Sequence, residues 1–148
     1  MPAPRIPFAT LQADAFRALS DLNAALYKSG LERKLIDLIF LRVSQINGCA
    51  YCVDLHWREL MAQEEDPRRL NSLSTWREAP FFSERERAAL NWADAVTDIK
   101  SLHCDEDRFA LLQAHFDSAQ VAALTFTVAA MNAWNRLGIS MKMQVKAE

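Results

Sequence analysis

Residues 47–56 read NGCAYCVDLH and place two thiols and one imidazole directly after a helix stop. The long apolar run before them ends at an Asn-Gly pair, and glycine can adopt the positive φ that closes a helix. A new helix can therefore begin at or near Cys49. In that helix Cys49 and Cys52 are three residues apart, and Cys52 and His56 are four apart. All three side chains then lie on one face.

Three chemical interpretations fit this spacing. A thiol near a helix N-terminus is favoured as thiolate, so the cysteines can form a redox dithiol that attacks a peroxide oxygen or a sulfur and closes a disulfide. Alternatively, the cysteines and His56 bind zinc, with a fourth ligand such as His103 or Cys104. In the third interpretation they simply pack in the core as small apolar residues. The spacing favours the redox dithiol.

The helix expected before this motif, residues 32–46, is apolar almost all round, which predicts a central, buried position. Asp37 interrupts it. One interpretation is an exposed carboxylate paired with Arg33 or Lys34 on the same helix. The other is a carboxylate turned toward the cysteine helix and able to exchange protons there. Arg42 is expected to be a salt-bridge partner without a catalytic role.

The remaining segments are predicted from their periodicity and capping residues. Residues 1–10 are expected to form an extended arm, either wrapped on a neighbouring subunit or loose. Gly138 is predicted to end the last helix, and the alternation in residues 139–146 is typical of a strand that pairs across a subunit interface, or of an irregular helix. Arg68 and Arg69 are expected to be solvated. Further helices are expected at 11–30, 49–60, 66–73, 83–99, 105–116 and 117–138.

On the cysteine helix, the apolar residues continue the face that carries the thiols, so the thiols are expected to face packed neighbours rather than open water. The polar residues Asp54, Arg58 and Glu59 are expected on the opposite side.

Composition limits the class of protein. The 148 residues are 51% hydrophobic and 24% charged, with three glycines and five prolines, which is typical of one soluble, mostly helical domain spanning residues 1–148. The net charge of −2 argues against nucleic-acid binding. No stretch reaches the length of a membrane span or resembles a signal peptide, so a cytoplasmic location is expected. Three cysteines in a reducing compartment are not a structural disulfide framework.

The motif and its lead-in, LRVSQINGCAYCVDLH at residues 41–56, resemble the AhpD-like alkylhydroperoxidase branch of the carboxymuconolactone decarboxylase family. The resemblance extends to residues 76–86 and 132–137. It implies that Cys52 is the peroxide-attacking thiolate and Cys49 the resolving thiol. His56 would act in a proton relay with the acidic residue twelve positions before Cys49.

That residue is Asp37, where better-studied members have Glu. Aspartate is one methylene shorter, so its carboxylate can require a bridging water to reach the dithiol.

The resemblance also implies an all-α, single-domain bundle of about six helices that assembles into symmetric homo-oligomers, trimers or hexamers, without metal or flavin. Lipoyl or thioredoxin-like proteins would supply the reducing dithiol. Members that decarboxylate a muconolactone lack the cysteine pair. The sequence therefore predicts a thiol peroxidase that reduces organic hydroperoxides or hydrogen peroxide. The alternative is a non-enzymatic redox sensor or a zinc-stabilised interaction module that uses the same Cys-x-x-Cys-x-x-x-His site.

Overall fold

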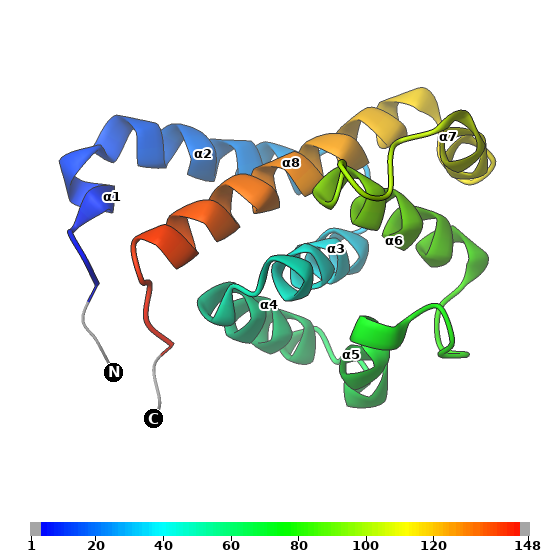
Figure 1. The fold of residues 1–148 in the computed structure, drawn as a ribbon, viewed down its shortest axis with the longest axis horizontal. Helices are drawn as coiled ribbons and strands as arrows, with labels where there is room; N and C mark the ends of the chain where they lie inside the picture. Colours follow the sequence, from blue (N-terminus) through cyan, green and yellow to red (C-terminus); the bar gives the residue numbers. More distant parts are fainter. Residues whose placement is uncertain (1–3, 146–148) are drawn as a thin grey trace.

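The computed structural model describes residues 4–145 (Figure 1). Over this range the chain is all-helical and contains no strand, which confirms the predicted fold class. Within residues 4–145 it has eight α-helices rather than about six: α5 is the short helix expected at 66–73, and α1 is an additional short helix at the start of the chain. The elements are α1 (Phe8–Leu11), α2 (Ala13–Leu26), α3 (Arg33–Asn47), α4 (Ala50–Ala62), α5 (Pro67–Ser72), the 3₁₀ turn η1 (Leu73–Thr75), α6 (Glu84–Thr97), α7 (Glu106–Gln113) and α8 (Ser118–Ser140).

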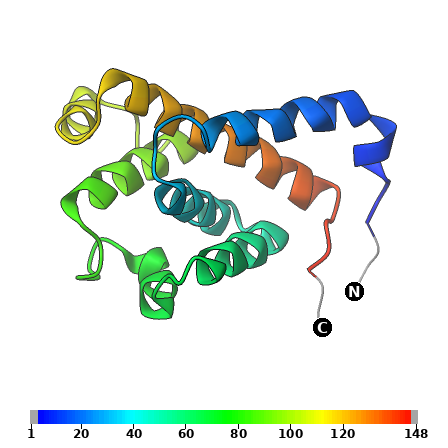
Figure 2. The same ribbon diagram turned by 180° about the vertical axis from the view of Figure 1, so that it is seen from behind.

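Helix α3 forms the centre of the molecule, as its apolar sequence predicts. It packs against α4, α6 and α8. Ile36, Ile39 and Phe40 are completely inaccessible to solvent. In Figures 1 and 2, α2 and α8 run side by side on one side of α3, while α4 and α5 lie on the other. None of the helices in the described range is both long and apolar enough to cross a bilayer.

The turn between α3 and α4 has the geometry that its sequence predicts. Gly48 has a φ of 72°, and its N–H caps the end of α3. Cys49 is the N-cap of α4 rather than its first helical residue, and its sulfur accepts a hydrogen bond from the Cys52 N–H. The turn thus places both cysteines at the N-terminus of α4, next to its unpaired N–H groups.

At the C-terminal end, the prediction that Gly138 ends the last helix is wrong, because α8 continues to Ser140. Of the two alternatives for the tail, the helical one holds for residues 139 and 140, and no strand forms in the described part. Residue 146 lies outside the described residues. The glycine serves packing instead of termination: a Cβ at position 138 would lie 2.9 Å from the Cys49 sulfur. The strand alternation fails because residues 139 and 140 belong to the helix.

The N-terminal arm is only partly extended. Residues 8–10, expected in the arm, belong to α1. The Arg5 N–H donates a hydrogen bond to the Met141 carbonyl at 3.0 Å, so this part of the arm lies against the end of α8 of its own chain. Residues 1–3 of the predicted arm lie outside the described range.

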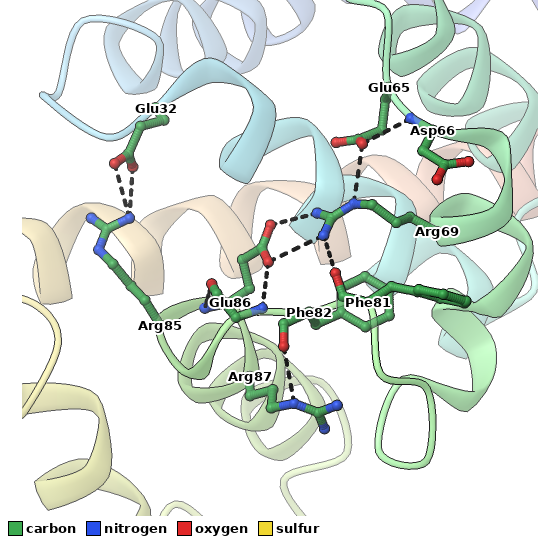
Figure 3. A network of polar contacts seen from close by, with 10 residues as sticks. Glu32, Glu65, Asp66, Arg69, Phe81, Phe82, Arg85, Glu86 and Arg87 are labelled. Atoms are coloured by element: carbon green, nitrogen blue, oxygen red, sulfur yellow. Dashed lines mark hydrogen bonds and ion pairs between the residues drawn. The ribbon is translucent and has the colours of Figure 1, made fainter.

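Arg69 is a further correction, because it is half-buried in a polar network between α5 and α6 (Figure 3). Its guanidinium lies 2.5 Å from a Glu86 oxygen and 3.1 Å from a Glu65 oxygen, and it also donates to the Phe81 carbonyl. Burial by itself raises the pKa of Glu86, but hydrogen bonds from Arg69 and from the Ser83 N–H outweigh it and hold the pKa below its usual value. The sequence did not indicate these partners because most of them are distant in the chain.

Other local predictions are confirmed. Ser83 and Glu86 form the predicted capping box at the start of α6. Arg42 forms the expected salt bridge, with its Nε 2.8 Å from an oxygen of the buried Asp94.

Candidate active site at the Cys49–Cys52 disulfide

Cys49 and Cys52 form a disulfide, with their sulfurs 2.17 Å and their Cα atoms 5.3 Å apart. The side chains are 1% and 4% exposed, respectively. The prediction that the thiols face packed neighbours is therefore confirmed. Both residues lie within one turn at the start of α4.

Helix α8 forms a wall directly against this disulfide. A Cβ at Gly138 would lie 2.9 Å from the Cys49 sulfur and 3.4 Å from the Cys52 sulfur, so only glycine fits at this point of α8 without a shift. The Met143 N–H donates to the Gly138 carbonyl at 2.9 Å and folds the following segment back over the same place.

The ends of α3 and α8 are joined by amide hydrogen bonds beside the disulfide. The Asn47 Nδ2 donates to Asn132 and Asn135 at 3.0 and 2.9 Å, and Asn135 donates to the Ser44 hydroxyl at 3.0 Å. Asn135 and Ser44 are completely buried, so these bonds fix the position of α8 against the turn that carries the cysteines.

A cavity of about 200 Å³ lies next to the disulfide. Cys52 and His56 line it, whereas Cys49 does not. The rest of the wall is mostly apolar and includes Phe16, Leu55, Trp134 and Met143. A small organic molecule in this cavity would therefore contact Cys52 and not Cys49.

His56 is 5% exposed and lies one turn after Cys52 on α4. Its Nδ1 is 2.8 Å from the Glu59 Oε2. A carboxylate can only accept a hydrogen bond, so Nδ1 is the donor in this contact, and in the neutral imidazole Nε2 has the free lone pair. The prediction that Glu59 lies on the opposite side of α4 is wrong, because a residue three positions after His56 lies beside it on the helix surface.

Asp37 is fully buried and faces α4. One of its oxygens accepts a hydrogen bond from the Tyr27 hydroxyl at 2.5 Å, and the other accepts one from the Gln63 Nε2 at 2.6 Å. The Nε of Arg33 lies 3.6 Å away. Both interpretations of Asp37 are therefore correct in part. Asp37 is paired with Arg33, as the first expects, but it is buried and faces α4, as the second expects.

The surroundings of Tyr27 keep its hydroxyl protonated. Burial, the hydrogen bond to Asp37 and the negative charges of Asp37 and Glu59 together raise the pKa of Tyr27 far above its usual value, and Arg33 counteracts them only in part. Tyr27 is therefore a fixed hydrogen-bond donor to Asp37 at physiological pH.

Ligand atoms of Asp37, His56 and Glu59 all lie within 4.8 Å of one another. Among residues 4–145 they are the one group of three or more histidine, cysteine, aspartate or glutamate side chains close enough to share a metal ion, and the group includes neither His103 nor Cys104. The separation is also one that a water molecule can bridge. We refer to Asp37, His56 and Glu59, together with Tyr27 and Gln63, as the relay cluster.

Cys104 lies apart from this site in the exposed loop before α7. Partial burial and Asp105 raise the pKa of its thiol, against the effect of Arg108. Exposure alone therefore does not make Cys104 a reactive thiol.

The fold and the site define a class of all-helical proteins that carry a Cys-x-x-Cys pair at the start of an internal helix, next to an apolar cavity. Residues 13–95 match the model of the carboxymuconolactone decarboxylase family, and the chain belongs to that family. Its similarity to a solved structure that is 40% identical to it places it in the AhpD-like branch of the family, as the sequence motif predicts.

One similar structure is that of a protein of unknown function from Agrobacterium tumefaciens, described as a candidate AhpD antioxidant defence protein. It is 40% identical, with 99% of this chain and 100% of that chain covered and a TM-score of 0.95. The uncharacterized protein YdfG of Bacillus subtilis (strain 168) is 30% identical over 137 residues, which cover 93% of each chain. The AhpD-core, peroxidase-related protein of Ralstonia eutropha JMP134 is 24% identical, with 94% of this chain and 74% of that chain covered and a TM-score of 0.83, and it supports the fold alone.

Proposed function

We propose that the protein is a thiol peroxidase that reduces hydroperoxides with Cys52 and Cys49. The observation that carries the proposal is the disulfide between two buried cysteines of which only Cys52 lines the apolar cavity. A peroxide in the cavity meets Cys52 first, and Cys49 is already within bonding distance. Membership of the AhpD-like branch supports the same chemistry.

In the proposed reaction, the Cys52 thiolate attacks the terminal oxygen of the hydroperoxide, and the O–O bond breaks. Cys52 becomes a sulfenic acid, and the leaving alkoxide takes a proton to give an alcohol, or water when the substrate is hydrogen peroxide. The Cys49 thiol then attacks the Cys52 sulfur, so the disulfide forms and water leaves. An external dithiol reduces the disulfide and is itself oxidised.

Two residues assist these steps in our proposal. His56 accepts the proton of the Cys52 thiol through Nε2, which its bond to Glu59 leaves free. Asp37 supplies a buried carboxylate close to the resulting imidazolium, with ligand atoms of the two residues within 4.8 Å of each other. A lipoyl or thioredoxin-like reductant, a cytoplasmic location and assembly into trimers or hexamers remain predictions from the sequence.

The test is a thiol count by mass mapping on the reduced, metal-free protein, before and after one equivalent of cumene hydroperoxide, with dithiothreitol-dependent peroxide consumption followed in parallel. We expect rapid formation of the Cys49–Cys52 disulfide, a free Cys104 and catalytic consumption. Slow oxidation without turnover would contradict the peroxidase and favour a redox sensor. Stoichiometric zinc in protein purified without chelator, lost on oxidation, would favour the interaction module.

A further inference from the structure

We propose that Glu59 is the positioning residue of His56 in this protein, and that Asp37 acts on His56 only at a distance. This inference rests on the proposed function, in which His56 takes the proton of Cys52. The resemblance assigns the relay carboxylate to the position of Asp37. The contacts of both carboxylates assign the direct role to Glu59.

The first argument is the bond itself. The Glu59 Oε2 lies 2.8 Å from the His56 Nδ1, and both residues belong to α4. Cys52, His56 and Glu59 follow one another at intervals of four and three residues, so a single helix sets their relative positions. The site therefore contains a thiol, an imidazole and a carboxylate in the order that a nucleophile, its base and the group that orients the base require.

The second argument is that Asp37 is occupied elsewhere. One oxygen accepts from Tyr27 at 2.5 Å and the other from Gln63 at 2.6 Å. Its side chain is completely buried and one methylene shorter than the glutamate of better-studied members. Gln63 also donates to the Glu59 carbonyl at 3.1 Å, so these partners hold Asp37 in place beside α4.

The third argument concerns charge. The titratable or charged groups around His56 are Cys52, Glu59 and the cavity-lining Tyr51 on α4, Asp37 and Arg33 on α3, and Tyr27 after α2. Of these, Glu59 alone is within hydrogen-bond distance of the ring, and its side chain is 33% exposed. Glu59 can therefore hold the Nδ1 proton while remaining in contact with solvent. A carboxylate there fixes the tautomer and ring orientation and stabilises the imidazolium that forms when Cys52 loses its proton.

The experiment measures the thiol directly and needs no peroxide. The rate at which iodoacetamide alkylates Cys52 in the fully reduced protein is followed against pH by mass mapping. Glu59→Gln keeps the size of the side chain and removes its charge. We expect alkylation at about pH 7 to slow by about tenfold and the profile to move to higher pH, with a smaller shift in Asp37→Asn.

Arg58→Ala is the matched control, because Arg58 is an exposed neighbour on α4 that pairs with Asp54 instead. Its profile should equal that of the wild type. Thermal unfolding of every variant separates a change in reactivity from a loss of fold. Glu59→Ala should regain part of the lost rate in sodium acetate but not in sodium chloride, since the position is partly open to solvent.

An unchanged profile in Glu59→Gln, or a larger shift in Asp37→Asn, would overturn the inference. Failure of the proposed function would look different: the profile of Glu59→Gln would shift while the wild type consumed no peroxide.

Discussion

The relay cluster and the arginine network of α5 and α6 both bury carboxylates between helices, but they neutralise them by different means. In the network, Glu86 meets the guanidinium of Arg69 at 2.5 Å, and Arg69 also lies 3.1 Å from Glu65 (Figure 3). An arginine does not release its proton at any physiological pH. The charges of this region are therefore permanent, and the region serves to join helices.

In the relay cluster, by contrast, the hydrogen-bond partners of the carboxylates are not guanidinium groups. Some of these partners carry a titratable proton, and the amide carries none. Asp37 accepts from a phenol and an amide, and Glu59 accepts from an imidazole. The Nε of Arg33 lies 3.6 Å from an Asp37 oxygen, and the Arg33 side chain is 62% exposed. The comparison teaches that the partner, rather than burial alone, decides whether a buried carboxylate supports the fold or can take part in proton transfer.

The largest effect is expected on peroxide consumption, from substitution of the cysteines of the candidate site. Cys52→Ser should reduce peroxide consumption with dithiothreitol by at least about 10³-fold, because a serine hydroxyl cannot form the sulfenic acid. Cys49→Ser should leave a Cys52 sulfenate that over-oxidises, which mass spectrometry detects. Cys104→Ser is the matched control and should retain full activity. Full activity in Cys52→Ser would show that the roles are wrongly assigned.

The second effect should appear in stability and not in activity. Arg69→Met removes the guanidinium and leaves two half-buried carboxylates without it, so we expect the free energy of unfolding to fall by about 2 kcal/mol. Urea unfolding measures the loss. Peroxide consumption at a temperature where the variant is folded should not change. A large loss of activity with intact fold would mean that the two regions are coupled and that the comparison fails.

The same network predicts a pH dependence. Glu86 has a pKa below its ordinary value of 4.5, so its contribution to stability is fully present above about pH 4.5 and is lost as the pH falls through the folded-state pKa. Wild type should therefore exceed Glu86→Gln in free energy of unfolding at about pH 7, and the gap should narrow at about pH 3. A gap that stays constant across this range would contradict the arginine-held carboxylate.

The smallest effect tests the helix wall of the site. Alanine normally stabilises a helix interior by about 1 kcal/mol relative to glycine, but in Gly138→Ala the clash with the Cys49 sulfur should reverse the sign, for a net loss of about 1 kcal/mol in the oxidised protein. Ala129→Gly, at an exposed position of α8, measures the ordinary effect of glycine. If Gly138→Ala raised the melting temperature, the close approach of α8 to the disulfide would be wrong.

Sequence patterns predicted those parts of the molecule that depend on neighbours in the chain. The buried α3, the glycine turn before Cys49 and the capping box of α6 follow from residues a few positions apart. They predicted less where a distant contact decides. Glycine is typical of a helix end, but Gly138 packs against the cysteines and lies inside α8.

The site shows the same division. Cys49, Cys52 and His56 were found from helical spacing alone, and that spacing could also have indicated Glu59, three residues after His56. No local pattern could indicate that Tyr27 would meet Asp37, because this contact depends on how α2 returns to α3.

The wall that Gly138 and Met143 form has a consequence for biosynthesis. Both residues are translated long after Cys49 and Cys52, so the thiols leave the ribosome well before α8 can cover them. During that interval they are accessible to any cellular oxidant or thiol reagent. A nascent chain modified at Cys49 would carry an adduct on a sulfur against which Gly138 of α8 packs, so the docking of α8 would have to adjust to it.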